Sequence, residues 1–135
     1  MMHLPRLLAP ALLAAALGGC AIIPNAAPPR TTALAPGSAV ALGQSVRVGS
    51  VIATPLAVVE DSRCPINARC VWAGRLVVKT RIDGDTWGEA AQLALGEPYT
   101  THGTTLALVS GEPGRVAGEG KETPKDAYRF TYEAR

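Results

Sequence analysis

Apolar and polar side chains alternate with a period of two in the middle of the chain. From residue 72 to 82, one parity is apolar, small or uncharged and comprises Trp72, Gly74, Leu76, Val78, Thr80 and Ile82. The other parity carries the charges of Arg75, Lys79 and Arg81, interrupted by Val77. Since successive side chains of a strand point to opposite faces of a sheet, this pattern predicts a half-buried β-strand across 72–82.

The same pattern predicts further strands. Tyr128, Phe130 and Tyr132 alternate with polar residues in a closing strand, and valines flank an arginine at the end of an early strand across 39–48. Apolar runs at 56–60, 93–95 and 106–108 predict three more. The stretch 89–95 also suits a short helix, because alanine, glutamine and leucine favour helices.

Turn residues separate these runs. Asp83-Gly84-Asp85 is typical of a hairpin turn in which the glycine supplies a positive φ. A calcium site at the two aspartates is disfavoured, because the other oxygen ligands of a calcium loop are missing. The stretch 111–125 is rich in glycine, proline and charge and predicts a long loop, for which mobility is preferred over a function.

Six or seven short strands with such turns predict an all-β fold. A small antiparallel β-sandwich is preferred over a small barrel. The 135-residue length suits one domain, which we expect across 38–135. The preceding stretch 20–37 contains Pro24, Pro28, Pro29 and Pro36 and predicts a flexible tether that can span about 50 Å when extended.

The amino-terminal segment has the composition of a secretory signal. Arg6 supplies positive charge, the stretch 7–17 is apolar apart from Pro10, and small residues follow. About a dozen apolar residues reach roughly 18 Å as a helix, well short of a hydrocarbon core of ~30 Å. A signal peptide across 1–19 is therefore favoured over a permanent transmembrane helix.

Leu17-Gly18-Gly19-Cys20 resembles the lipobox of bacterial lipoproteins. The resemblance implies cleavage before Cys20 and attachment of diacylglycerol there, with further acyl chains such as palmitate. The alternative is an ordinary signal peptide with a chance cysteine. Two or three acyl chains hold a protein on a membrane almost permanently. Ala21 after the cysteine resembles lipoproteins passed to the outer membrane, so we expect an envelope location that faces the periplasm in cells with two membranes.

The cysteines predict one disulfide. Once Cys20 is lipidated, only Cys64 and Cys70 remain, and an oxidising compartment favours their bond. The alternative is a free dithiol for redox work or metal binding. The intervening residues 65–69 do not match the two-residue spacing of redox and zinc motifs, so the structural disulfide is preferred.

The segment 60–74 holds the most distinctive composition of the chain. Pro65 and Asn67 favour a turn between the cysteines, and Arg63 is expected to pair with Asp61 or Glu60. Cys70 and Trp72 share strand parity, which predicts that the indole packs beside the disulfide inside the sheet layer. Gly74 leaves room for a bulky neighbour.

This segment resembles the Asp-Ser-Arg-Cys-Pro and Cys-x-Trp-Ala-Gly signature of a family of small, largely uncharacterised bacterial lipoproteins and secreted domains. The resemblance extends over 41–132 and includes Tyr128 on the final strand. The stretch 112–125 departs from it by its glycine and charge. The family implies the fold and the disulfide but no activity.

The remaining composition narrows the function classes. A net charge of +2 without a basic stripe argues against a nucleic-acid partner. His102 is the one histidine after residue 19, lies in a predicted exposed turn, and has no Gly-x-Ser-x-Gly elbow to serve. We therefore expect no catalytic residues, no cofactor and no metal site.

Two uses of the loop follow. It is either a stapled corner of the core or a recognition loop whose contact residues are Asp61, Arg63, Asn67, Arg69 and Trp72. The leading hypothesis is a membrane-anchored, non-catalytic envelope domain that is structural or binds a protein or glycan. The second is an inhibitor of an extracytoplasmic hydrolase, which inserts the arginines of loop 61–72 into an acidic cleft. The third, an enzyme of unknown type, is the least favoured.

Overall fold

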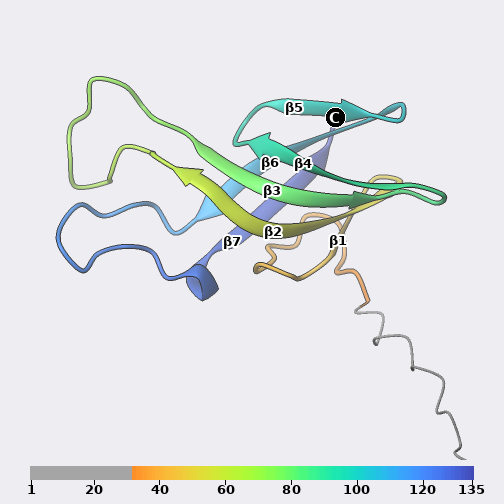
Figure 1. Ribbon diagram of the computed structural model, residues 1–135, viewed down its shortest axis with the longest axis horizontal. Coiled ribbons are helices and arrows are strands. Elements are labelled where there is room, and N and C mark those ends of the chain that lie inside the picture. Colours follow the sequence, from red (N-terminus) through yellow and green to blue (C-terminus); the bar gives the residue numbers. More distant parts are fainter. Residues whose placement is uncertain (1–31) are drawn as a thin grey trace, which may run out of the picture.

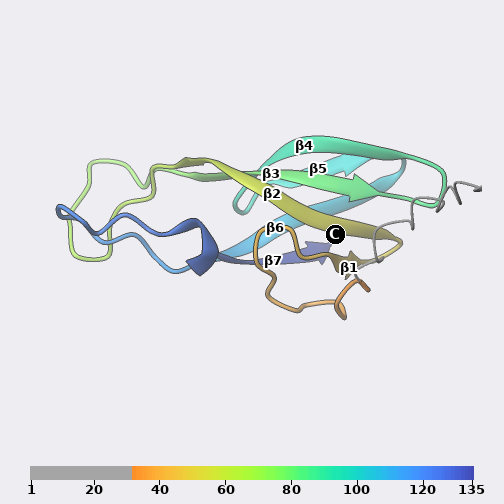
Figure 2. The same ribbon diagram turned by 60° about the horizontal axis from the view of Figure 1, so that its bottom comes forward.

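The computed structural model describes residues 32–135, which form two antiparallel sheets. The first has the order β1-β2-β3-β4 and consists of β1 (Val46–Val48), β2 (Val51–Asp61), β3 (Leu76–Asp83) and β4 (Gly88–Ala94). The second has the order β5-β6-β7 and consists of β5 (Pro98–Thr101), β6 (Thr104–Glu112) and β7 (Arg129–Ala134), preceded by the 3-10 turn η1 (Lys125–Ala127). Figures 1 and 2 show β2 and β3 layered over β6 and β7. The predicted all-β, sandwich-like fold is confirmed, and no barrel closes among the described residues.

The core lies between the two sheets and is built from the inward parity of their strands. Its buried apolar residues are Val40, Val46, Val48, Val51, Ala53, Leu76, Val78, Ile82, Leu93, Leu106, Leu108, Tyr128, Phe130 and Tyr132. The alternation predicted for 76–82 and for 128–132 is confirmed, because Lys79, Arg81 and Arg129 are exposed between buried neighbours. Removal of this apolar surface from water is the main stabilising contribution to the fold.

The predicted strand across 72–82 begins four residues late. β3 starts at Leu76, because Gly74 has a left-handed φ of 67° that interrupts the extended chain. Trp72 therefore lies on neither face of the sheet, and its predicted packing inside the sheet layer is wrong: 65% of the residue is exposed.

The early strand is also shorter than predicted and comprises only β1. Val40 instead forms an isolated pair of backbone hydrogen bonds with Phe130 on β7. Leu34 bonds to the chain beside Val46, so pairing begins before the expected domain boundary at 38. The predicted signal peptide 1–19, the predicted lipidation site Cys20 and the predicted tether up to residue 31 lie outside the described residues. From residue 32 onward, no helix is long and apolar enough to cross a membrane.

The stretch 89–95 contains β4 rather than the alternative helix. Residues Gly88–Ala94 pair in full register with β3, whose free edge outweighs the weak helix propensity of this short segment. The hairpin turn at 83–85 is confirmed, but Gly84 has no positive φ. A Cβ at this position would collide with the indole of Trp87, so a larger residue there requires that side chain to move. β5 was not predicted from the sequence.

Two long connections project from the same end of the domain (Figure 1). We call residues 62–75, between β2 and β3, the disulfide loop, and residues 113–128, between β6 and β7, the opposing loop. The carboxyl ends of β2 and β6 lie at this end of the domain, so both loops begin there. Hydrogen bonds between Asn67 and Ala117 join the two loops. Figure 2 shows them side by side after rotation.

One buried polar pair lies in the core. The hydroxyls of Thr80 on β3 and Tyr132 on β7 are 2.8 Å apart. Burial raises the pKa of Tyr132 and keeps its hydroxyl protonated. The pair joins the two sheets through the centre of the domain.

A double-mutant cycle tests this pair. Thr80→Val and Tyr132→Phe should each lower the free energy of unfolding by about 1–3 kcal/mol, because each leaves a buried hydroxyl without its partner. The double variant should lose less than the sum of the two. The measurement is urea unfolding at pH 7, and additive losses would contradict the coupling.

Candidate functional site

The disulfide loop is closed by two close approaches. Cys64 and Cys70 form the predicted disulfide, with their Cα atoms 5.8 Å apart. At the base of the loop, Ser62 and Cys64 donate backbone hydrogen bonds of 2.9 and 2.8 Å to the carbonyls of Arg75 and Ala73. Between them, a Cβ on Gly74 would collide with the carbonyl oxygen of Ser62. The neighbour for which Gly74 leaves room is therefore backbone, and the two arms of the loop lie in close contact there.

Arg63 joins the disulfide loop to both sheets. Its Nε and Nη2 donate to the two carboxylate oxygens of Asp61, each at 2.8 Å. Its Nη1 donates to the carbonyl of Gly111 on β6, and its Nη2 also donates to the carbonyl of Pro113 at 3.1 Å. The side chains of Arg63 and Asp61 are only 17% and 8% exposed. The predicted Arg63–Asp61 pair is confirmed, and it turns Arg63 away from the outer surface of the loop.

Tyr128 completes this network from β7's side. Its hydroxyl donates to Oδ2 of Asp61 at 2.8 Å. Burial acts to raise the pKa of Asp61, but the hydrogen bonds from Arg63 and Tyr128 outweigh it, so the pKa lies below its ordinary value. Burial and the neighbouring carboxylate raise the pKa of Tyr128. Asp61 is therefore a carboxylate that accepts from two protonated donors.

A second ion pair lies at the outer edge of the loop base. Arg75 Nε is 2.8 Å from Oε2 of Glu60, and the Ser62 hydroxyl donates to Oε1 at 2.9 Å. The hydrogen bonds from Ser62 and Arg75 lower the pKa of Glu60 below its ordinary value. Both arginines at the base of the loop are thus neutralised by carboxylates of β2.

The opposing loop is held against the disulfide loop rather than free. The side-chain amide of Asn67 donates to the carbonyl of Ala117 at 3.2 Å and accepts from its N–H at 2.8 Å. Arg115 donates to the carbonyl of Arg63 at 2.9 Å and accepts from the N–H of Ile66 with its own carbonyl at 2.9 Å. Within the stretch 111–125, for which mobility is the preferred prediction, residues 115–117 are held by these contacts.

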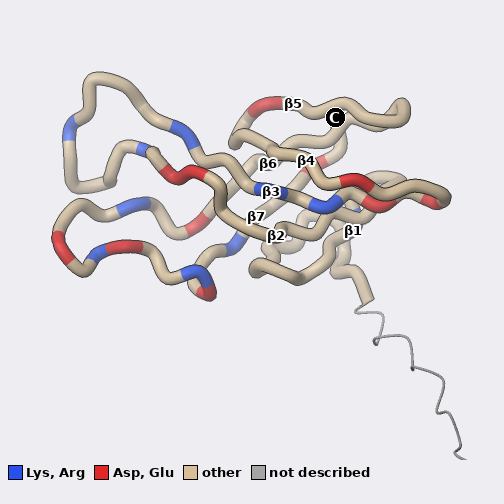
Figure 3. The backbone as a smooth tube through the Cα atoms, in the orientation of Figure 1, with Lys and Arg blue, Asp and Glu red and all other residues tan. Residues whose placement is uncertain are grey.

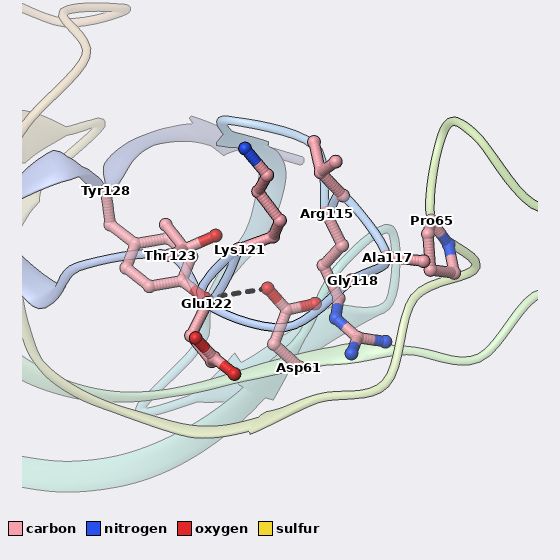
Figure 4. Close-up of a pocket in the computed structure, with 10 residues that line it drawn as sticks. Asp61, Pro65, Arg115, Ala117, Gly118, Lys121, Glu122, Thr123 and Tyr128 are labelled. Carbon is pink, nitrogen blue, oxygen red and sulfur yellow. Dashed lines mark hydrogen bonds between the residues drawn. The ribbon is translucent and has the colours of Figure 1, made fainter.

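A pocket of about 420 Å³ lies between the two loops (Figure 4). Its lining residues are Asp61, Pro65, Arg115, Val116, Ala117, Gly118, Lys121, Glu122, Thr123 and Tyr128. The oxygens of Asp61 already accept three hydrogen bonds. His102 is not part of the lining: it lies in the β5–β6 turn, as predicted, and its ring stacks on Trp87 with a centroid separation of 3.9 Å. Across 32–135, no group of three or more metal-ligating side chains occurs.

The five predicted recognition residues divide into two groups. Asp61, Arg63 and Asn67 point into the contacts that hold the loops together. Arg69 and Trp72 make none of these contacts and are exposed, and Asn67 is exposed as well despite its hydrogen bonds. Sequence reasoning missed Ile66 and Val71, which are 77% and 106% exposed, and the structural role of Arg115. The apolar character of Ile66 and Val71 in a polar loop was the only available signal.

Comparisons with models of protein families, with curated proteins and with solved structures found no match to this chain. The resemblance of segment 60–74 to a lipoprotein family therefore stays a prediction. The candidate site is defined by its geometry alone.

The charge of Asp61 should make stability depend on pH. Asp61→Asn should lower the free energy of unfolding by about 2–3 kcal/mol at pH 7, less than for a fully buried pair because Arg63 keeps some exposure. Because the folded pKa of Asp61 is depressed, this contribution is present above the unfolded value of about 3.9 and is lost as the pH falls through the folded value. Urea unfolding from pH 7 to pH 2.5 measures the difference.

The matched control is Glu133→Gln, an exposed carboxylate 4.0 Å from Arg135. It should change the free energy of unfolding by less than about 0.5 kcal/mol at any of these pH values. A loss in Asp61→Asn that stays constant down to pH 2.5 would contradict the charge as its cause.

Gly96 and Gly74 both have a left-handed backbone, but only Gly74 is crowded. Replacing each by alanine therefore distinguishes the cost of backbone conformation from the cost of a steric clash. Gly96→Ala, at φ 83° in open space, should cost about 1–2 kcal/mol of unfolding free energy. Gly74→Ala, at φ 67° against the Ser62 carbonyl, should cost at least twice as much, because the arms of the loop must also move apart. Thermal unfolding compares the two, and equal losses would show that the contact between the arms is not tight.

Proposed function

We propose that this protein is a membrane-anchored lipoprotein of the bacterial cell envelope whose domain binds a protein or glycan and performs no catalysis. The anchor is supported by the signal-like segment 1–19 and the lipobox-like sequence that ends at Cys20. The observation that carries the binding role is the disulfide loop. It is held in one conformation by the disulfide and by hydrogen bonds to β2, β6 and the opposing loop, yet Ile66, Val71 and Trp72 face solvent. A purely structural corner gains nothing from exposed apolar side chains.

The direction of the loops fits such an anchor. In both Figure 1 and Figure 2, the first described residues lie away from the end that carries the two loops. A lipid on Cys20 that precedes them leaves the loops free to reach a partner in the surrounding compartment. In a cell with two membranes, the proposed location is the outer membrane, facing the periplasm.

The second candidate is an inhibitor of an extracytoplasmic hydrolase acting through loop 61–72. The observation that favours it is Arg69, which is exposed on a stapled loop. A loop that is already ordered loses little conformational entropy when it enters a cleft. Arg63 takes no part in this contact, because it is engaged with Asp61 and the carbonyls of β6 and the opposing loop.

Metabolic labelling with an alkyne analogue of palmitate tests the anchor. The full chain produced in a bacterial cell should take up the label and lose the mass of residues 1–19. Cys20→Ser should take up none, because a hydroxyl cannot form the thioether. The double variant Cys64→Ser/Cys70→Ser is the matched control and should be labelled like the wild type. A mature chain that begins at Cys20 but carries no lipid mass would refute the anchor.

A further inference from the structure

We call residues 66–72 the tip of the disulfide loop. The tip carries the three most exposed large apolar residues of the described part of the chain. Ile66, Val71 and Trp72 are 77%, 106% and 65% exposed, whereas every other exposed large apolar residue from 32 to 135 is below 50%. The domain has a well-formed core in which other valine and isoleucine side chains are fully buried and Trp87 is partly buried. The tip therefore holds apolar surface that folding leaves in water.

This tip is presented in a preformed shape. The disulfide closes it, the close backbone contact at Gly74 narrows its base, and Asn67 fastens it to the opposing loop. Because the loop is ordered before binding, little conformational entropy remains to be lost on association. A convex, rigid tip with an exposed tryptophan is the kind of anchor that fills a pocket in a protein partner.

Charge distinguishes the possible partners. The disulfide loop contains three arginines and no carboxylate, and two of these arginines are paired with Asp61 and Glu60. Arg69 is exposed and forms no ion pair within 32–135, so the tip presents one free cation. Figure 3 shows only basic residues along the disulfide loop but both signs along the opposing loop. A carboxylate beside an apolar pocket complements this pattern.

Two other classes of partner fit less well. Anionic lipid headgroups attract clusters of basic residues, but the adjacent opposing loop balances three basic residues with Glu119, Glu122 and Asp126 and adds no net positive charge. The hydroxyl groups of a glycan match the donors of Arg69 and Trp72, but they leave Val71 and Ile66, which have neither donor nor acceptor, without a complementary surface. A protein cleft satisfies both the apolar side chains and Arg69.

We propose that Val71 and Trp72 insert into an apolar cleft of another envelope protein, while Arg69 pairs with a carboxylate at the rim of that cleft. This inference rests on the binding role and the envelope location of the proposed function. It adds the contact residues and the chemistry of the partner. The pair of apolar side chains supplies affinity and the ion pair supplies orientation and specificity.

Site-specific photo-crosslinking in living cells tests this contact. The full chain carries benzoylphenylalanine in place of Val71, or in place of Asp85 as a control at the opposite end of β3. The chain with benzoylphenylalanine at position 71 should give a discrete adduct with one protein after illumination, and the chain with benzoylphenylalanine at position 85 should not. In the chain that carries benzoylphenylalanine at position 71, Trp72→Ala and Arg69→Glu should each reduce the yield of the adduct at least tenfold, whereas Arg69→Lys should retain it. The crosslinked peptide of the partner should contain or adjoin Asp or Glu.

Each other outcome overturns the inference. These outcomes are an adduct with lipid only, an adduct with cell-wall glycan only, no adduct, an equal adduct at Asp85, and an adduct that survives Arg69→Glu. Urea unfolding of the Trp72→Ala and Arg69→Glu chains should match the wild type, which separates lost contact from lost folding. If the wild-type chain proves to carry no lipid in the labelling experiment but still gives the adduct, the anchor is refuted and this contact is not.

Discussion

The bidentate pair between Arg63 and Asp61 is the contact on which the loop end of this domain depends. It lies at the point where β2 leaves its sheet, and the same guanidinium reaches the carbonyls of Gly111 and Pro113 where β6 ends. Tyr128 approaches the same carboxylate from the chain that enters β7. One charged group thus fixes the starting points of both long loops. Among the described residues, no other ion pair lies between the ends of the two sheets.

Because the bases of both loops are fixed, some side chains of the disulfide loop hold it in place while others are left exposed. The inner side chains of the disulfide loop satisfy hydrogen bonds of the opposing loop, and its outer side chains remain in water. This division explains how a segment without regular secondary structure holds apolar groups outward instead of collapsing onto them. The disulfide acts within the loop alone and adds to this order without joining the two sheets.

The sequence predicted what depends on neighbours along the chain. Strand parity identified the buried faces of β3 and β7, and the cysteine count identified the Cys64–Cys70 bond. It did not predict the pairing of the two loops, because the partners of Arg63 and Asn67 lie about 50 residues away and are mostly backbone carbonyls without a sequence signature. Trp72 was misplaced because parity arguments assume a continuous strand, and the left-handed Gly74 breaks it.

The pairing of Leu34 with β1 determines how mechanical load enters the molecule. A pull on the chain from its amino-terminal side reaches two backbone hydrogen bonds at Leu34 first, then the pair between Val40 and Phe130 of β7, and then the three-residue edge strand β1. These contacts peel one at a time, so the edge yields before β2 and β3 are stretched. The two loops lie at the other end of the domain, so they keep their shape while the chain before β2 lengthens.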